Sequence, residues 1–438
     1  MAGFMNPFDE ETQEGIILLA VAENKLTWNL LQSFMQKSFS KPLPQWSSGY
    51  GPMHGQVVLR EVLSKFMNKF IVKNGIEMPI NPDELSCATG CSSIISNMFY
   101  CLFEPNDTIL IPSPYYSAFD SDLRAYAELN RHPVSVDNLT FEISVERLEQ
   151  EYQNVIINTG KPPKALLLTN PHNPTGIIMH QNKIMDIVKW CESKENFHLI
   201  SDEIYALSYY GPQLIPKEGT ESPIHNEFVS LGNLCKGQLG DFKHIIWGMS
   251  KDFGMSGLRF GMLWTQNAKL FEAMANVAPF NSIPGPIQAM LCDMLGDDDF
   301  VNEYLTQNSA NLAKSCQVLM NGFDKLDIPY ITPSSGMFLW INMKKLLPGI
   351  ALKHQLVYNE KNEEEDEFLK SKEAFVLEDL LYRDMWQEAN VVATPGSSQH
   401  MSHAGWFRCC YAAIPVPVLE IGVQKLTTLF LSLNTTPN

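Results

Sequence analysis

The sequence predicts an α/β protein with a large three-layer domain and a smaller α+β domain. Short apolar runs alternate with helix-length amphipathic segments such as 92–103 and 181–195, which favours a mostly parallel sheet covered by helices on both faces. After about residue 298 the pattern changes to one long helix over 300–323 and then to strands near 330–332 and 337–341. A chain of 438 residues, 45% of them hydrophobic, is long enough for two cores.

These changes of pattern set the predicted domain boundaries. Residues 1–55 form an N-terminal arm that joins the small domain, and residues 56–298 form the large domain. Residues 299–438 form the small C-terminal domain. The acidic stretch 359–367 within it is interpreted as a solvated insertion.

Polar side chains follow the apolar runs of the large domain. Runs at 165–169, 198–200 and 244–249 come just before Asn173, before Asp202 and before Lys251. In parallel α/β sheets, ligands bind at the carboxyl ends of the strands. The order of runs and polar residues therefore predicts one site at that edge.

Three short segments carry the reactive side chains of this edge. They are Asn-Pro-His-Asn-Pro-Thr-Gly at 170–176, Ser-Asp-Glu-Ile-Tyr at 201–205, and Ser-Lys-Asp-Phe-Gly at 250–254. A pyridoxal phosphate site needs a lysine amine for an imine, a carboxylate for the ring nitrogen, donors to the ring oxygen and a cation for the phosphate. The residues that meet these four requirements are, respectively, Lys251, Asp202, Tyr205 with Asn173, and Arg259. The sequence therefore predicts pyridoxal 5'-phosphate as cofactor.

Composition narrows the class of partner. With 32 basic and 49 acidic residues the net charge is −17, which argues against nucleic acid or an anionic membrane surface. The nine cysteines contain no C-x-x-C pair and are interpreted as reduced residues of a cytoplasmic protein. The N-terminus lacks the apolar stretch of a signal peptide, and we find no run of some 18 apolar residues that indicates a membrane span. The spacing of the C-terminal histidines and cysteines fits no standard metal site, so we expect none: His400, His403, Cys409 and Cys410.

Further segments carry a family resemblance. They are Gly-Ile-Ile at 15–17 with Ala-Glu-Asn at 22–24, Pro-Tyr-Tyr at 114–116 with Phe-Asp at 119–120, and Pro-Gly-Ser-Ser at 395–398 with Gly-Trp-Phe-Arg at 405–408. With them the chain resembles fold-type-I pyridoxal-phosphate enzymes of the class I aminotransferase group, and within that group the 1-aminocyclopropane-1-carboxylate (ACC) synthase branch. The resemblance runs from about residue 15 to the C-terminal helix. It implies the aspartate-aminotransferase-like fold.

The chemistry and the resemblance together give roles to residues of the large domain. Lys251, next to Ser250, would form the imine and then remove the substrate's α-proton. Asp202 would hold the protonated ring nitrogen, although an aspartate there could also be a helix N-cap. Asn173 and Tyr205 would donate hydrogen bonds to the ring oxygen. The phosphate would bind a fixed cation and a helix N-terminus, namely Arg259 with Gly90, Cys91 and Ser92.

The resemblance implies further roles at more distant positions. Tyr116 would stack on the ring, unless it is an ordinary core aromatic, and Arg408 would clamp the substrate α-carboxylate. Glu23 would act on the substrate. Tyr50 would reach the neighbouring subunit's phosphate, which implies a homodimer with shared active sites. The family often has a serine where this chain has Gly248, so we expect one hydroxyl contact to the phosphate to be missing.

Three reactions remain open at this point. The same site could transaminate, expel a β-substituent, or close a three-membered ring, which is the synthase reaction on S-adenosylmethionine. Glu23 matches the glutamate of the synthases, whereas Ser121 stands where plant synthases carry arginine. We expect an amino-acid substrate with a sulfur leaving group, with an aminotransferase or a carbon–sulfur lyase as alternatives. A non-catalytic regulator predicts loss of Lys251 or Arg408, and both are present.

Overall fold

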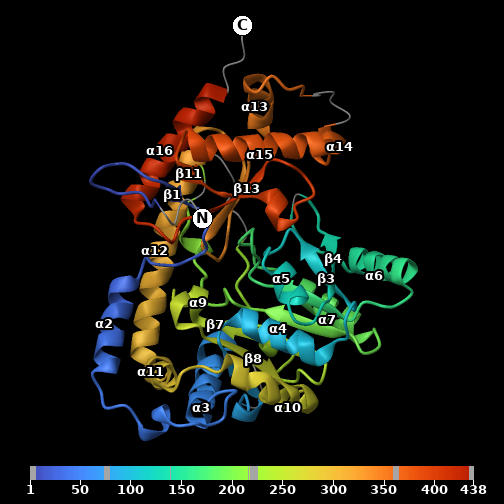
Figure 1. Cartoon of the computed structure of the whole chain (residues 1–438), viewed down its shortest axis with the longest axis vertical. Coiled ribbons are helices and arrows are strands. Elements are labelled where there is room, and N and C mark those ends of the chain that lie inside the picture. The colour runs from blue at the N-terminus through green and yellow to red at the C-terminus, as the bar shows by residue number, and fades with distance from the viewer. Residues whose placement is uncertain are drawn as a thin grey trace.

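The chain folds into two lobes, shown by the computed structural model in Figure 1. It describes residues 6–73, 79–138, 140–215, 217, 225–358 and 365–433. The larger lobe, in the lower part of the view, holds a central sheet. The smaller lobe above it is built from the C-terminal third of the chain.

A seven-stranded sheet forms the centre of the large lobe, in the order β2-β8-β7-β6-β5-β3-β4. Its strands are β2 (Leu85–Ala88), β3 (Thr108–Ser113), β4 (Asn130–Ser135), β5 (Ala165–Thr169), β6 (His198–Asp202), β7 (Lys243–Gly248) and β8 (Gly261–Thr265). The strands from β4 to β7 pair in parallel, and β8 runs antiparallel to both β7 and β2. The predicted, mostly parallel sheet is confirmed.

Helices cover both faces of this sheet because successive strand residues point to opposite sides. On β5 and β7, Leu166 and Trp247 enter one apolar core, while their neighbours Leu167 and Ile246 enter another. The first core is completed by α3 (Val57–Phe66), α6 (Val145–Thr159), α7 (Gln181–Glu192) and α11 (Gly285–Leu295). The second is completed by α4 (Cys91–Leu102), α5 (Phe119–Arg124) and α10 (Ala268–Val277). This is the three-layer architecture that the sequence predicts.

Local sequence explains where these helices begin and end. The Ser144 side chain accepts a hydrogen bond from the Arg147 N–H and caps α6, and Gly160 ends that helix with a φ of 72°. The Asn267 side chain caps α10 through the Leu270 N–H. The predicted helices at 92–103 and 181–195 correspond to α4 and α7.

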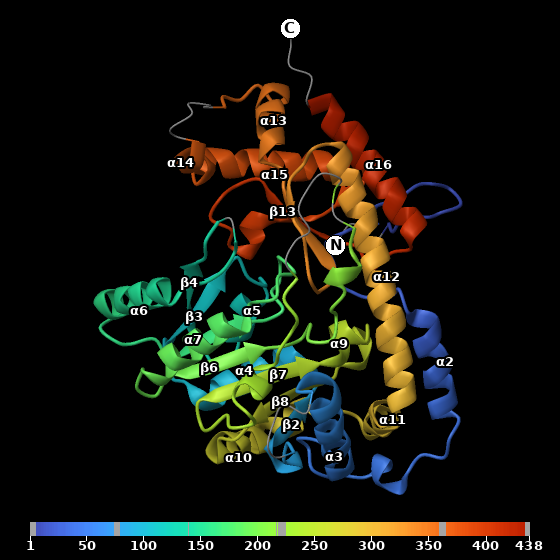
Figure 2. The same cartoon turned by 180° about the vertical axis from the view of Figure 1, so that it is seen from behind.

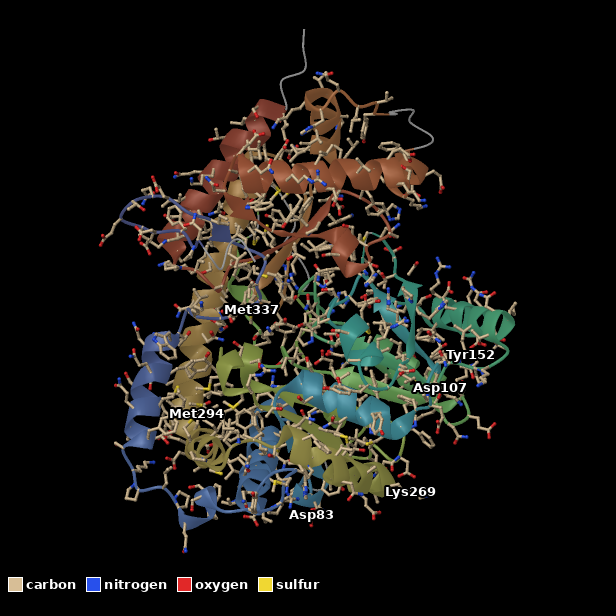
Figure 3. All side chains as sticks on the ribbon, in the orientation of Figure 1. Asp83, Asp107, Tyr152, Lys269, Met294 and Met337 are labelled. Atoms are coloured by element: carbon tan, nitrogen blue, oxygen red, sulfur yellow. The ribbon has the colours of Figure 1, made fainter. Side chains whose placement is uncertain are left out.

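The small lobe packs helices on a four-stranded antiparallel sheet, ordered β12-β13-β10-β9. These strands are β9 (Tyr330–Ile331), β10 (Phe338–Asn342), β12 (Thr394–Pro395) and β13 (Trp406–Cys410). The helices are α13 (Leu347–Lys353), α14 (Glu365–Leu369), α15 (Lys372–Gln387) and α16 (Val416–Leu433). Figure 3 labels Met337 in the core of this lobe and Met294 in that of the large lobe.

Two segments connect the lobes. Helix α12 (Asp298–Lys325) begins in the core of the large lobe and ends in that of the small lobe, as seen from behind in Figure 2. The N-terminal strand β1 (Ile17–Leu18) pairs in parallel with β11 (Val391–Val392) of the small lobe. Helix α2 (Trp28–Phe39) then packs against α11. The N-terminal segment therefore contacts first the small lobe and then the large lobe, before the chain enters helix α3.

We expected no membrane span because the sequence has no run of some 18 apolar residues. Among the described residues, helix α16, with 18 residues and a mean hydropathy of 1.3, is nevertheless long and apolar enough to cross a membrane by length and composition. One side of it, including Leu419, Leu426 and Phe430, is buried in the small-lobe core, as in a core helix. Most of the predicted acidic insertion lies outside the described residues; its last three positions begin α14.

Candidate active site

A cavity of about 160 Å³ lies at the carboxyl ends of the parallel strands. Its lining residues are Ala22, Cys91, Ser92, Ile95, Tyr116, Phe119, Asp122, Thr169, Asn173, Asp202, Ile204, Tyr205, Ser250, Lys251, Ser256 and Arg259. Strand register explains part of this set, because Thr169 and Asp202 are paired at the ends of β5 and β6. The cavity lies at the edge of the sheet where the order of apolar runs and polar residues predicts a site.

Lys251 brings an amine into this cavity. It lies on the short helix α9 (Met249–Asp252), which starts directly after β7. Its Nζ donates a hydrogen bond of 2.5 Å to the carbonyl of Ala22 in the N-terminal segment. Burial lowers the pKa of Lys251 from its ordinary value. Burial favours the neutral amine, which is the form that attacks an aldehyde or takes a proton, and the hydrogen bond holds the amine in place.

Asp202 and Tyr205 contribute an acid and a donor from the end of β6. Burial raises the pKa of Asp202 to about 7, while the Ile204 N–H donates to its Oδ1 at 3.3 Å. A cation nearby would therefore stabilise the charged form of this carboxylate. Tyr205 is 2% exposed, and burial raises its pKa, so the phenol stays protonated and able to donate.

Asn173 connects the cavity to Arg408 of the small lobe. Arg408 lies on β13 and donates from Nη1 to Asn173 Oδ1 at 3.0 Å and from Nη2 to the Ala20 carbonyl at 3.0 Å. Its buried Nε has no partner among the described residues. Since the Asn173 oxygen faces Arg408, its NH₂ group is left to donate elsewhere. An arginine that is 6% exposed and forms no ion pair with a carboxylate in the described part of the chain fits an anion-binding role.

A phosphate-sized anion has a cradle at the start of α4. Gly90 precedes this helix with a φ of 91°, and a Cβ there would lie 2.5 Å from Arg259 Nη2. Arg259 is held over the helix start by bonds from Nη1 to the Ser256 carbonyl at 2.9 Å and from Nη2 to the Thr89 carbonyl at 3.4 Å. Free N–H groups of a helix N-terminus and a fixed guanidinium favour an anion together.

Packing explains why position 248 is a glycine. A Cβ at Gly248 would lie 2.8 Å from Cys91 Sγ and 2.7 Å from the Phe260 carbonyl oxygen. Both distances are too short for a side chain, so the thiol of Cys91 takes up the space beside this glycine. The absence of a hydroxyl at this position follows from that packing.

Four predicted residues do not line the cavity: Gly90, Arg408, Glu23 and Tyr50. The first two adjoin it through Arg259 and Asn173, as described. Glu23 Oε2 lies 3.3 Å from Lys25 Nζ, and Glu23 Oε1 accepts from Ser256 Oγ at 3.4 Å. Tyr50 is 99% exposed. The roles assigned to these four residues stay predictions.

The structure also adds residues that the sequence reasoning missed. Ile95 and Asp122 follow Cys91 and Phe119 by four and three positions, so helical spacing could have indicated both. Ala22 had no sequence signal, because only tertiary contact brings its carbonyl to Lys251. Within the described part of the chain, no group of three or more His, Cys, Asp or Glu is arranged to hold a metal.

The donor set fits pyridoxal phosphate. The buried amine of Lys251, the carboxylate of Asp202 with its raised pKa, phenol and amide donors, and an anion cradle surround the cavity. The unpartnered Arg408 Nε adds a donor for a second anion. These are the groups that an aldehyde, a ring nitrogen, a ring oxygen, a phosphate and a substrate carboxylate require.

Comparison with known proteins assigns the class. The chain belongs to the aminotransferase class I and II family, whose family model matches residues 14–426. It is therefore a pyridoxal-phosphate-dependent enzyme with an aspartate-aminotransferase-like fold, as predicted.

Its sequence relatives include ACC synthases. It is 30% identical to 1-aminocyclopropane-1-carboxylate synthase 6 of Oryza sativa subsp. japonica over 436 residues, covering 95% of this chain and 72% of that protein. It is 28% identical to 1-aminocyclopropane-1-carboxylate synthase 7 of Arabidopsis thaliana, with 96% and 88% covered. It is 29% identical to "Probable aminotransferase ACS12" of the same plant, with 98% and 81% covered.

Solved structures show the same fold at lower identity. An aspartate aminotransferase double mutant of Thermus thermophilus superposes with a TM-score of 0.74 at 19% identity, over 96% of this chain and 93% of that one. The aromatic aminotransferase of Pyrococcus horikoshii gives 0.73 at 17% identity, over 95% of each chain.

Proposed function

We propose that this enzyme acts on an α-amino acid with a sulfur leaving group, such as S-adenosylmethionine, as an ACC-synthase-like lyase. The observation that carries the proposal is the pair formed by the buried Lys251 amine and the Arg408–Asn173 link, one suited to an α-proton and the other to an α-carboxylate. The synthase relatives support the choice of substrate. The net charge of −17 also suits a cationic substrate, though weakly.

The residues around the cavity divide into cofactor and substrate groups. Bound pyridoxal phosphate withdraws electrons from the substrate α-carbon and so makes the α-proton acidic. Asp202 holds the protonated ring nitrogen, and Asn173 and Tyr205 donate to the ring oxygen. Arg259 and the start of α4 bind the phosphate. Tyr116 lines the cavity on the side of α5.

Substrate turnover requires one clamp and one base. Arg408 binds the α-carboxylate through its planar fork, which fixes the α-carbon relative to the cavity. Lys251 Nζ, once free of the cofactor, takes the α-proton. Burial lowers the pKa of Lys251, so a larger fraction of the amine is neutral and able to accept that proton.

Ring closure places a further demand on geometry. The α-carbon must attack the γ-carbon while the sulfur departs with the electron pair of its bond, and no proton may return to the α-carbon first. Glu23 follows Ala22, whose carbonyl accepts the hydrogen bond from Lys251 Nζ, and the charge of Glu23 acts to raise the pKa of that amine. We assign Glu23 to the substrate's reacting end.

Product identification tests this function. Purified enzyme incubated with S-adenosylmethionine should release methylthioadenosine together with the cyclopropane amino acid, measured by chromatography and mass spectrometry. Methylthioadenosine with a keto acid instead would indicate elimination. If neither product forms and an ordinary amino acid plus a keto acid turns over, the synthase proposal is wrong.

An aminotransferase is the second candidate. It is favoured by the likeness to "Probable aminotransferase ACS12". It is also favoured by Ser121, which stands where plant synthases carry arginine; this serine is exposed, and its Oγ–H donates a hydrogen bond to the Ala118 carbonyl at 2.8 Å. A carbon–sulfur lyase would share the first proton transfer with both. The same product assay, run with cysteine conjugates and with amino acid and keto acid pairs, separates the three.

We further propose a homodimer in which Tyr50 completes the neighbouring subunit's phosphate site. Tyr50 is 99% exposed, and Phe280, at 87%, is another large exposed side chain of the same lobe. Tyr50→Phe should raise the cofactor dissociation constant about 10- to 100-fold, since one hydrogen bond to a charged group is removed. Cofactor titration of the apoenzyme measures this.

Two controls accompany the Tyr50 prediction. Tyr126→Phe alters another exposed tyrosine, 69% exposed, and should leave cofactor affinity unchanged. Sedimentation should show a dimer for wild type and both variants. A wild-type monomer that binds the cofactor with full affinity would contradict the shared site.

A further inference from the structure

Asp122 is a carboxylate in the cofactor cavity that the roles above do not use. It lies on α5 three residues after Phe119, lines the cavity and is only 8% exposed. Its neighbour Ser121 points outward instead. The cavity therefore holds two carboxylates, Asp122 and Asp202.

Asp122 has no cationic partner. Among the described residues no lysine, arginine or histidine lies within 4.0 Å of it to form an ion pair. Its side chain receives only one long hydrogen bond, from Ser92 Oγ to Oδ2 at 3.4 Å. A buried carboxylate without a counter-charge is costly. Burial accordingly raises the pKa of Asp122 to about 6.

The charge of Asp122 acts on Asp202. Burial raises the pKa of Asp202 to about 7, and Asp122 adds to this as the largest effect from another charged group. The remaining titratable groups of the cavity are three that burial keeps neutral, Cys91, Tyr116 and Tyr205, and two basic groups, Lys251 and Arg259. Of the basic groups, Lys251 is taken by the cofactor aldehyde and Arg259 by the phosphate.

We infer that the charge of Asp122 adds to that of Asp202 in keeping the ring nitrogen of the cofactor protonated. A negative charge that lines the same cavity stabilises the positive form of the ring, as the charge of Asp202 does. Two carboxylates around one cationic N–H hold its proton to a higher pH than one carboxylate alone. The missing counter-charge of Asp122 is then the ring itself. The inference rests on the assignment of Asp202 to the ring nitrogen.

The test is nitrogen-15 NMR of holoenzyme reconstituted with ring-labelled pyridoxal phosphate, followed from pH 6 to 10. Asp122→Asn keeps the shape but removes the charge. It should lower the pH at which the ring nitrogen loses its proton by about one unit. Asp122→Glu should restore most of the shift.

Matched variants separate this inference from the site assignment. Asp186→Asn removes an exposed charge on α7 and should leave the titration unchanged. In an Asp202→Asn background, Asp122→Asn should lower the pH of ring deprotonation further, because each carboxylate acts on the ring. If Asp202→Asn alone leaves the titration unchanged, the ring-nitrogen assignment fails. If Asp202→Asn shifts it and Asp122→Asn does not, only the role of Asp122 is overturned; a raised substrate KM with an unchanged titration also overturns it.

Discussion

Lys251→Ala should abolish covalent attachment of the cofactor and reduce kcat by at least about 10²–10⁴-fold, the range for losing proton transfer by a positioned base. The reason is that one amine serves both steps. Lys251 Nζ is the amine of the cavity; the Ala22 carbonyl holds it in place, and burial lowers its pKa. Wild-type protein should be yellow, and this variant should lose the absorption band of the covalently bound cofactor.

Borohydride reduction followed by peptide mapping measures the attachment site directly. In wild type the label should appear on the peptide that contains Lys251. Lys269→Ala is the matched control, since Lys269 is an exposed lysine of α10, labelled in Figure 3. This control should keep colour, label and activity. Label on any other lysine would show that the assignment is wrong.

Arg408→Ala should raise the substrate KM by about 30- to 700-fold. Removing one partner of a buried, bidentate charge pair costs about 2–4 kcal/mol, and each 1.4 kcal/mol corresponds to a factor of about ten. The absorption of the bound cofactor should stay close to wild type, because Arg408 does not line the cavity and reaches it through Asn173. Steady-state kinetics and absorption spectra measure the two effects.

Two variants sharpen the Arg408 test. Arg408→Lys keeps the charge but loses the planar fork, so its KM should lie between wild type and Arg408→Ala. Arg383→Ala removes an exposed arginine of α15 and should leave KM unchanged. An unchanged KM in Arg408→Ala with a folded, yellow protein would mean that another cation holds the substrate.

Much of the cavity follows from local sequence. Asp202 ends a strand of the parallel sheet, Asn173 and Lys251 follow the ends of two others by a few residues, and parallel strands end at one edge. A short distance along the chain from the end of a strand is then enough to place a residue at this edge of the sheet. Helical spacing extends the same reasoning to Ile95 and Asp122, although the side chain first singled out on α5 was Ser121, which faces away.

The sequence by itself therefore determined the α/β class, the order of the strands' reactive ends and the cofactor, because these depend on periodicity and on residue types at short spacing. Only the tertiary structure joined Lys251 Nζ to the Ala22 carbonyl, 229 positions away, and Arg408 to Asn173, 235 positions away. It also decided that Asp122 is buried without a cation. Such contacts depend on how two lobes and an N-terminal segment pack, and no local pattern records that packing.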